Sequence, residues 1–264
     1  MLTEDICNRI VSAYAIGSSV KVLANEYGYD VSTIRKVLKR AGVFDRCREM
    51  GKSAYAVDVD YFRLIDAPDK SYWLGFIFAD GWVVRREGYL SFGVELKESD
   101  VGHLEKLARA IGSNRPISTR TRHIWGMDFT MHTLACGIGE FCKNLAEKGI
   151  VSSKKDINRT LLSVPIELRK HFWRGMVDGD GYVRCTKRGD WEVGIVGDLA
   201  TCEAFKGFSS TFQDSQMNVH PQRTIYQFKL QGLYGLRMIR ELYGCRGEAL
   251  DRKVNIVKCI LEQP

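Results

Sequence analysis

Two stretches one hundred residues apart carry the same pattern, and they constrain the fold more than any other feature of the chain. Residues 73–81 read WLGFIFADG, and residues 173–181 read WRGMVDGDG. A tryptophan, a glycine, an aspartate and a second glycine each recur at an offset of 100 residues. A repeat of this length is too long for a solenoid unit, so it predicts two similar lobes.

Each repeat predicts the order helix, strand, strand, helix, strand, strand, helix. The expected strands are 82–87, 89–97, 115–121 and 124–132 in the first lobe, and 182–188, 190–196, 218–223 and 225–231 in the second. Beyond the motifs the repeat is expected to continue at an offset of 99, which aligns Phe129 with Phe228 and Met131 with Leu230. The strands alternate in polarity, so each sheet should cover helices with an apolar face and leave a polar face open.

The alternation assigns side chains to these two faces. The apolar face is expected to hold Leu90, Phe92, Val94, Leu96, Trp125, Met127, Phe129, Met131, Tyr226, Phe228 and Leu230. Long polar side chains on the open faces would suit contacts with phosphates and base edges, although any solvated sheet displays them too. The candidates for DNA contact are Arg120, Arg122, Arg184, Lys187, Arg188, Gln227, Lys229 and Gln231.

The two motif helices each end in a carboxylate. Small residues stand four apart on one face of each helix, Gly75 with Ala79 and Gly175 with Gly179, which would let the two backbones pack closely. Asp80 and Asp180 would then meet, where two carboxylates repel each other and oppose the helix dipoles. A divalent cation would relieve both problems. The alternative is that each aspartate only caps a turn.

The paired motifs resemble those of the LAGLIDADG homing endonucleases in their single-chain, two-motif form. The resemblance covers residues 67 to 264 and implies an α+β fold with two pseudo-symmetric αββαββα lobes, at 67–153 and 154–264. It further implies that both antiparallel sheets form a saddle over the major groove of double-stranded DNA. Gly75 and Gly175 would then lie at the lobe interface.

The same resemblance implies a set of catalytic groups. Asp80 and Asp180 would bind Mg²⁺ or Mn²⁺ together with the backbone carbonyls of Ala79 and Gly179. Lys97, at the end of the second strand, would be the catalytic lysine of lobe one. Lobe two departs from the pattern with Gly197, and either Lys187 or Lys229 could substitute. Asp178 is expected to be structural, because Phe78 takes its place in the first motif.

The first 52 residues predict a separate all-α domain. Thr3, Ser18 or Ser19, and Ser32 are expected to cap three helices, and the sequence resembles helix-turn-helix domains of resolvase and phage type. The third helix would present a polar surface to DNA, formed by Ser32, Thr33, Arg35, Lys36, Lys39 and Arg40. Residues 53–66 are expected to form a linker.

Composition excludes several other classes of protein. No run of eighteen apolar residues predicts a membrane span, and the eight cysteines form no C-x-x-C pair. The N-terminus carries no signal pattern, which predicts an intracellular protein. The family resemblance implies a monomeric, site-specific endonuclease in the cytoplasm or nucleoid of a host, in a phage or intron setting. A DNA-binding regulator that has lost cleavage, and a maturase acting on intron RNA, stay open as alternatives. An intein fits poorly, because the chain ends in LEQP rather than His-Asn.

Overall fold

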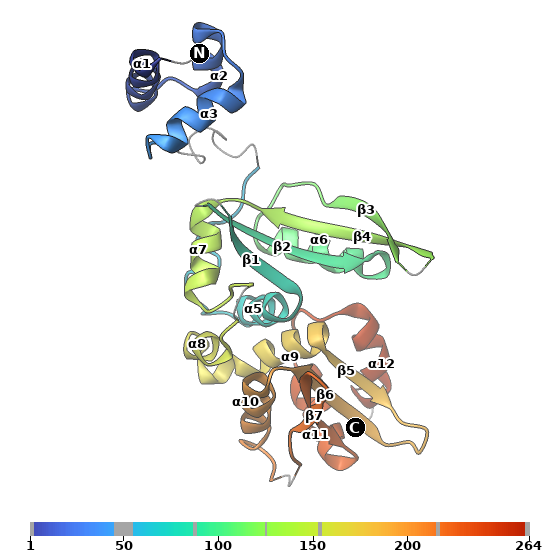
Figure 1. The fold of residues 1–264 in the computed structure, drawn as a ribbon. Helices are drawn as coiled ribbons and strands as arrows, with labels where there is room; N and C mark the ends of the chain where they lie inside the picture. Colours follow the sequence, from blue (N-terminus) through green and yellow to red (C-terminus); the bar gives the residue numbers. More distant parts are fainter. Residues whose placement is uncertain are drawn as a thin grey trace. The chain divides into compact units, whose positions relative to one another are not determined.

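The computed structural model describes residues 3–44, 55–86, 89–124, 126–152, 155–214 and 217–261. The chain divides into two compact units, Met1–Ala54 and Tyr55–Pro264, which are considered separately (Figure 1). None of the described helices is both long and apolar enough to cross a membrane.

The first unit contains helices α1 (Glu4–Ala15), α2 (Val20–Tyr27) and α3 (Val31–Arg40). The hydroxyls of Thr3 and Ser19 accept hydrogen bonds from the first turns of α1 and α2, as the sequence predicts. The third helix begins earlier than predicted, after Asp30 rather than after Ser32. The helices enclose a small apolar core of Ile10, Tyr14, Val20, Leu23, Ala24, Ile34, Val37 and Leu38.

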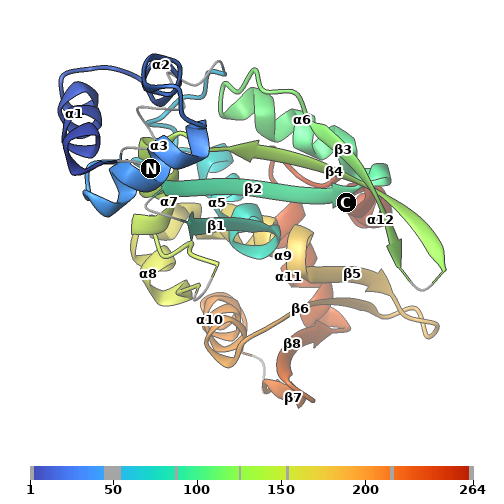
Figure 2. The same ribbon diagram turned by 45° about the horizontal axis from the view of Figure 1, so that its top comes forward.

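The second unit contains two four-stranded antiparallel sheets, which confirms the predicted sheet content (Figures 1 and 2). The first sheet has the order β1-β2-β4-β3 and comprises β1 (Gly81–Arg86), β2 (Tyr89–Lys97), β3 (Ser118–Ile124) and β4 (Met127–Cys136). The second has the order β5-β6-β8-β7 and comprises β5 (Gly181–Cys185), β6 (Trp191–Gly197), β7 (His220–Gln222) and β8 (Ile225–Gln231).

Helices cover the apolar face of each sheet. Those of the first lobe are α5 (Pro68–Asp80), α6 (Val101–Ala110) and α7 (Gly139–Glu147), with α8 (Ile157–Leu162) in the connection that follows. Those of the second lobe are α9 (Arg169–Asp180), α10 (Leu199–Ser209), α11 (Leu233–Tyr243) and α12 (Asp251–Leu261). Short 3₁₀ turns at Glu98–Asp100 and Ile166–Leu168 precede α6 and α9.

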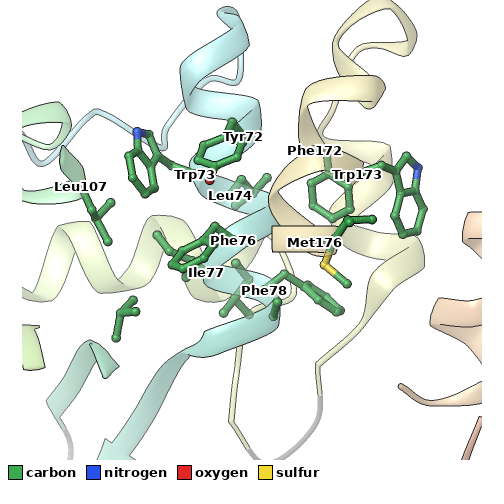
Figure 3. Close-up of a cluster of buried hydrophobic side chains, with 14 of the residues drawn as sticks. Tyr72, Trp73, Leu74, Phe76, Ile77, Phe78, Leu107, Phe172, Trp173 and Met176 are labelled. Carbon is green, nitrogen blue, oxygen red and sulfur yellow. The ribbon is translucent and has the colours of Figure 1, made fainter. Parts of the chain in front are cut away.

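The motif helices α5 and α9 pack against each other in the centre of the second unit. A Cβ at Gly75 would stand 2.0 Å from the carbonyl oxygen of Phe172, and one at Gly175 would stand 2.2 Å from that of Tyr72. Only glycine permits this approach, because the atoms on the other side belong to the backbone and cannot swing away. Trp73 and Trp173 point away from the contact, each into the core of its own lobe, where Trp73 packs on His103 and Trp173 on Phe205 (Figure 3).

The predicted linker at 53–66 is, from residue 55 onward, part of the second unit. Tyr61, Phe62 and Ile65 are buried in its core. The carbonyl of Val59 accepts a hydrogen bond of 2.8 Å from the side-chain amide of Asn144 in α7. Positions 53 and 54 lie outside the described residues. The described part of this segment therefore packs on the first lobe and is not a free linker.

In the fourth strand of the first lobe, β4, the face that packs on the core is the opposite of the predicted one. Leu134 pairs with Val94, and Val94 pairs with Gly81, whereas in the second lobe Phe228 pairs with Ile195 and Ile195 with Gly181. Leu134 thus corresponds to Phe228, at an offset of 94 rather than 99. Because the difference of five residues is odd, residues that the predicted alignment matches, such as Phe129 and Phe228, lie on opposite faces of their sheets.

The consequence is that Met127, Phe129 and Met131 lie on the open face, and the prediction that they face the core was wrong. Met131 pairs with Lys97 and Arg120, and Phe129 pairs with Arg122, so these side chains share one side of the sheet. Met127 is 55% exposed and Phe129 is 39% exposed. Trp125 lies outside the described residues.

Candidate active site

Asp80 and Asp180 are the last residues of α5 and α9, and each helix passes directly into the first strand of its lobe. The glycine that follows each aspartate permits this abrupt change of direction. A Cβ at Gly81 would stand 2.7 Å from the carbonyl oxygen of Ile77, and one at Gly181 would stand 2.7 Å from that of Gly194. The motif thus places a carboxylate where a helix end meets the inner end of a sheet.

The two acidic helix ends meet, as the pattern of small residues predicts. A Cβ at Gly179 would lie 2.3 Å from that of Ala79 and 3.3 Å from carboxylate oxygen Oδ2 of Asp80. Burial raises the pKa of Asp80 to about 6, and the nearby charge of Asp180 adds to the shift. The pKa of Asp180 is also raised by desolvation. The carboxylates therefore form one electrostatic site.

Two lysines that sequence reasoning missed lie at this site. The ammonium of Lys155 donates to the carbonyls of Phe78 and Ala79, the latter at 2.9 Å. Lys253 donates to the carbonyls of Val177, Asp178 and Gly181, the last two at 3.0 and 2.8 Å. Each lysine therefore satisfies the free carbonyls at the C-terminal end of one motif helix.

The lysines also interact electrostatically with the two acids. Lys155 and Lys253 both lower the pKa of Asp80 and of Asp180, against the larger effect of burial. Burial in turn lowers the pKa of Lys155, and it lowers that of Lys253 to about 8. The repeat in the sequence could have indicated these two lysines. Lys155 follows α7 and Lys253 follows α11, the last helix of the repeat in each lobe, and the two lysines are 98 residues apart.

Asp178 is fully buried beside the site and anchors the start of α12. Its carboxylate accepts hydrogen bonds from the hydroxyls of Tyr72 at 2.8 Å and Tyr243 at 2.7 Å, and from the backbone N–H of Leu250 at 2.8 Å. Lys253 lies one turn into the helix that Leu250 precedes. The geometry agrees with a structural part for Asp178, which helps to hold Lys253 in place.

Among solved structures, the chain is similar to the homing endonuclease I-WcaI bound to its DNA recognition sequence, with a TM-score of 0.57. The two are 11% identical, over 75% of this chain and 90% of that chain. The N-terminal LAGLIDADG domain of DUF199/WhiA matches with a TM-score of 0.45 and 14% identity, over 75% of this chain and 93% of that one. No protein-family model and no curated protein matches the chain.

At this level of identity the likeness shows the fold alone. The chain has the LAGLIDADG fold. In this chain Asp80 and Asp180 lie where the two lobes meet, and the first strand of each sheet starts directly after them.

Four of the predicted open-face cations of the second unit form ion pairs with two glutamates that sequence reasoning also missed. Glu95 forms ion pairs with Arg120 and with Arg122, the latter at 2.6 Å. Glu192, almost fully buried, pairs with Arg184 at 2.7 Å and with Lys229 at 3.1 Å. Each lobe therefore has one central carboxylate that fixes the positions of two basic side chains.

The remaining predicted residues lie apart from the acids. Lys97 is exposed at the end of β2 opposite Met131, three residues beyond Val94, which pairs with the motif glycine Gly81. Lys187 and Arg188 are exposed in the turn between β5 and β6, while Gln227 donates to the hydroxyl of Tyr182 at 3.1 Å. Gln231 lies on the open face opposite Glu192. The structure thus brings Asp80, Asp180, Ala79 and Gly179 together.

The donor set at the acid pair fits a hard divalent cation that shares its coordination with a phosphate. Within the described part of the chain, no three His, Cys, Asp or Glu side chains gather as a metal cage. Mg²⁺ commonly binds one or two protein carboxylates, with substrate phosphates and water completing the octahedron. The two motif carboxylates supply that number of ligands, and their raised pKa values show that a positive charge there would be stabilising.

We expect Asp80→Asn to stabilise the chain in EDTA at neutral pH. Because the folded pKa of about 6 exceeds the ordinary 3.8, the stability that Asp80 contributes is present below about pH 4 and lost as the pH rises through 6. The loss is about 3 kcal/mol. Urea unfolding followed by fluorescence reports the second unit alone, since all the tryptophans lie between positions 73 and 191. If the variant and the wild type had the same free energy of unfolding at both pH 4.5 and pH 7, burial of Asp80 would not be the cause of its raised pKa.

Proposed function

We propose that the chain is a site-specific double-strand DNA endonuclease that uses Mg²⁺ or Mn²⁺ at Asp80 and Asp180. The observation that carries the proposal is the convergence of two carboxylates at the ends of two largely buried helices. A protein that only bound DNA would gain nothing from carboxylates facing phosphate, because they repel it. Their presence at the start of both sheets supports hydrolysis over binding alone.

The acids and the lysines of the site have different roles in this proposal. Asp80 and Asp180 hold the metal, with the carbonyls of Ala79 and Gly179 as further oxygen donors. When bound, the metal ions supply an activated water and stabilise the charge on the phosphate and the leaving 3′ oxygen. Lys155 and Lys253 keep a positive charge beside the carboxylates. We assign the lysine role to this pair in preference to Lys97.

The open faces of the two sheets bind the DNA in this proposal. The basic and amide side chains on them meet the phosphates and base edges of the major groove, with Arg120, Arg122, Arg184 and Lys229 held by their glutamates. Because both acid-bearing lobes belong to one chain, a monomer suffices to cut both strands.

The first unit adds affinity as a helix-turn-helix domain. On α3, the side chains of Ser32, Arg35, Lys36, Lys39 and Arg40 are exposed and that of Thr33 is half-buried, whereas Ile34, Val37 and Leu38 are buried. This is the division of faces that a recognition helix needs. The cations on one side would neutralise phosphates while the other side keeps the three helices together.

Removing the positive charges of α3 is expected to weaken DNA binding and to lower the dependence of that binding on salt. The variant combines Arg35→Gln, Lys36→Gln, Lys39→Gln and Arg40→Gln. Each phosphate that the variant no longer neutralises should lower the slope of log Kd against log salt by about 0.9, so we expect a fall of roughly 2 to 4 with the position of the cut unchanged. Arg9→Gln with Lys21→Gln, on α1 and α2, is the matched control. An unchanged slope in the fourfold variant would remove this unit from the DNA interface.

The test of the proposed function starts from a randomised library of duplex DNA. Duplexes retained in Ca²⁺ are transferred to Mg²⁺, and the ends of any fragments are sequenced. Cleavage at one long site supports the endonuclease. Selection of a site that stays intact in Mg²⁺ would instead favour a DNA-binding regulator. Failure to select any duplex would direct the same assay to intron RNA, as expected for a maturase.

A further inference from the structure

The outer part of the first sheet has an open face whose centre is apolar. Residues 127–130 of β4 pair with β3 alone, because β2 ends at Lys97, opposite Met131. The hairpin of β3 and β4 therefore continues past the end of β2 as a two-stranded arm (Figure 2). On its open side, Met127 and Phe129 are the large apolar side chains with the greatest exposure.

The basic residues of the arm leave this apolar surface uncovered. Arg122 stands directly opposite Phe129, yet its guanidinium turns back along the sheet to the carboxylate of Glu95. Arg120 does the same from its place opposite Met131. Glu95 thus draws both cations toward the middle of the sheet. Met127 and Phe129 stay 55% and 39% exposed, between a cationic middle and the tip of the arm.

The second lobe has no equivalent of this arm among its described residues. Leu134 in β4 corresponds to Phe228 in β8, since each lies opposite the β2 or β6 residue that pairs with the motif glycine. Strand β8 begins at Ile225, three residues before that point, whereas β4 begins seven residues before it. The only β8 residue that matches an apolar position on the open side is Ile225, which corresponds to Met131 and is 45% exposed.

We propose that Met127 and Phe129 read the methyl groups of thymines in the major groove, in the outer part of the half-site bound by the first lobe. The inference rests on the proposed function, because it takes duplex DNA as the occupant of the open face. Thymine is the only base of unmodified DNA that presents a methyl group in the major groove, and apolar side chains discriminate it by contact. The neighbouring arginines match the negative charge of the same ligand.

The position of these thymines follows from the length of the strand. Leu134 pairs with Val94, which in turn pairs with the motif glycine Gly81, so Leu134 marks the inner end of the sheet. Met127 lies seven residues from Leu134, which is about 23 Å along β4. At 3.4 Å per base pair this distance corresponds to roughly seven base pairs from the cut. The inner base pairs, beside Glu95 and its arginines, would be read by hydrogen bonds instead.

The test replaces thymine by deoxyuridine in the duplex selected from the randomised library, one half-site at a time. This substitution removes only the methyl group and preserves base pairing. We expect each outer thymine of the first lobe's half-site to lose about fourfold in affinity as uracil. In the variant with Phe129→Ser and Met127→Ser, thymine and uracil duplexes should bind equally. Both side chains are exposed, so the folded state should tolerate the change.

Two further variants separate this reading from a general loss of binding. Ile225→Ser should leave discrimination in the first lobe's half-site intact, and so should Leu162→Ser, which alters an exposed apolar residue on α8. Equal binding of thymine and uracil duplexes by the wild-type chain would overturn the inference while the endonuclease stands. Discrimination that survives in the double serine variant would overturn it too. If the library yields no selected duplex, the proposed function itself fails.

Discussion

Replacing either Asp80 or Asp180 with asparagine is expected to reduce Mg²⁺-dependent cleavage of the selected duplex by roughly a thousandfold or more. Asparagine keeps the shape of the side chain but removes the charge that holds a divalent cation. Asp180 is close enough to raise the pKa of Asp80, so we expect one substitution to slow cleavage of both strands. Strand-resolved rates, measured with each strand labelled at its own end, give the readout.

The same variants should bind the duplex in Ca²⁺-free buffer at least as tightly as the wild type, because each removes a negative charge that faces phosphate. Asp60→Asn serves as the matched control, since Asp60 is an exposed carboxylate paired with Arg63 near the start of the second unit. The control should cut at the wild-type rate. An Asp80→Asn or Asp180→Asn variant that still cuts at that rate would remove the motif acids from catalysis.

Adding a single methyl group at the contact between the motif helices is expected to lower the stability of the second unit strongly. In Gly75→Ala the new Cβ would stand 2.0 Å from the carbonyl oxygen of Phe172, and in Gly175→Ala it would stand 2.2 Å from that of Tyr72. Helix backbones cannot yield to such a contact without separating. We expect each substitution to reduce the free energy of unfolding by about 3 kcal/mol or more.

The chain offers matched controls for this prediction in two other helices. Gly102 in α6 and Gly207 in α10 have open space around the position of a Cβ. Alanine at either position should leave stability unchanged or raise it by up to about 1 kcal/mol, because alanine is the better helix former. Urea unfolding followed by tryptophan fluorescence distinguishes the cases. If Gly75→Ala were as stable as Gly102→Ala, the close approach of α5 and α9 would be wrong.

The features that sequence predicted well are those set by neighbouring residues or by the strongest copy of the repeat. Both motif helices end at the predicted aspartates, and β2 spans the predicted residues. The short-range alternation around Phe92 and Val94 placed the core face of β2 correctly, because both residues are buried. The convergence of the acids followed from small residues four apart on the two motif helices, which is also a local pattern.

The features that sequence did not predict depend on contacts between distant segments. An apolar run of Met127, Phe129 and Met131 suggests a buried face, but strand pairing and not composition decides which side meets the helices. Lys155 and Lys253 look like ordinary surface lysines until α5 and α9 present free carbonyls to them. Likewise, Phe62 became part of the core only because the segment that carries it packs beside α7.

The most direct test of the central claim is the position of a Mn²⁺ ion in crystals of the chain with its selected duplex, located by anomalous scattering. A metal held by the motif acids predicts a peak within coordination distance of the carboxylates of Asp80 and Asp180 and of a phosphate of the DNA. It predicts no such peak in crystals of the Asp80→Asn, Asp180→Asn double variant with the same duplex. A wild-type complex with DNA on both open faces, and no anomalous peak at the acid pair, would contradict it.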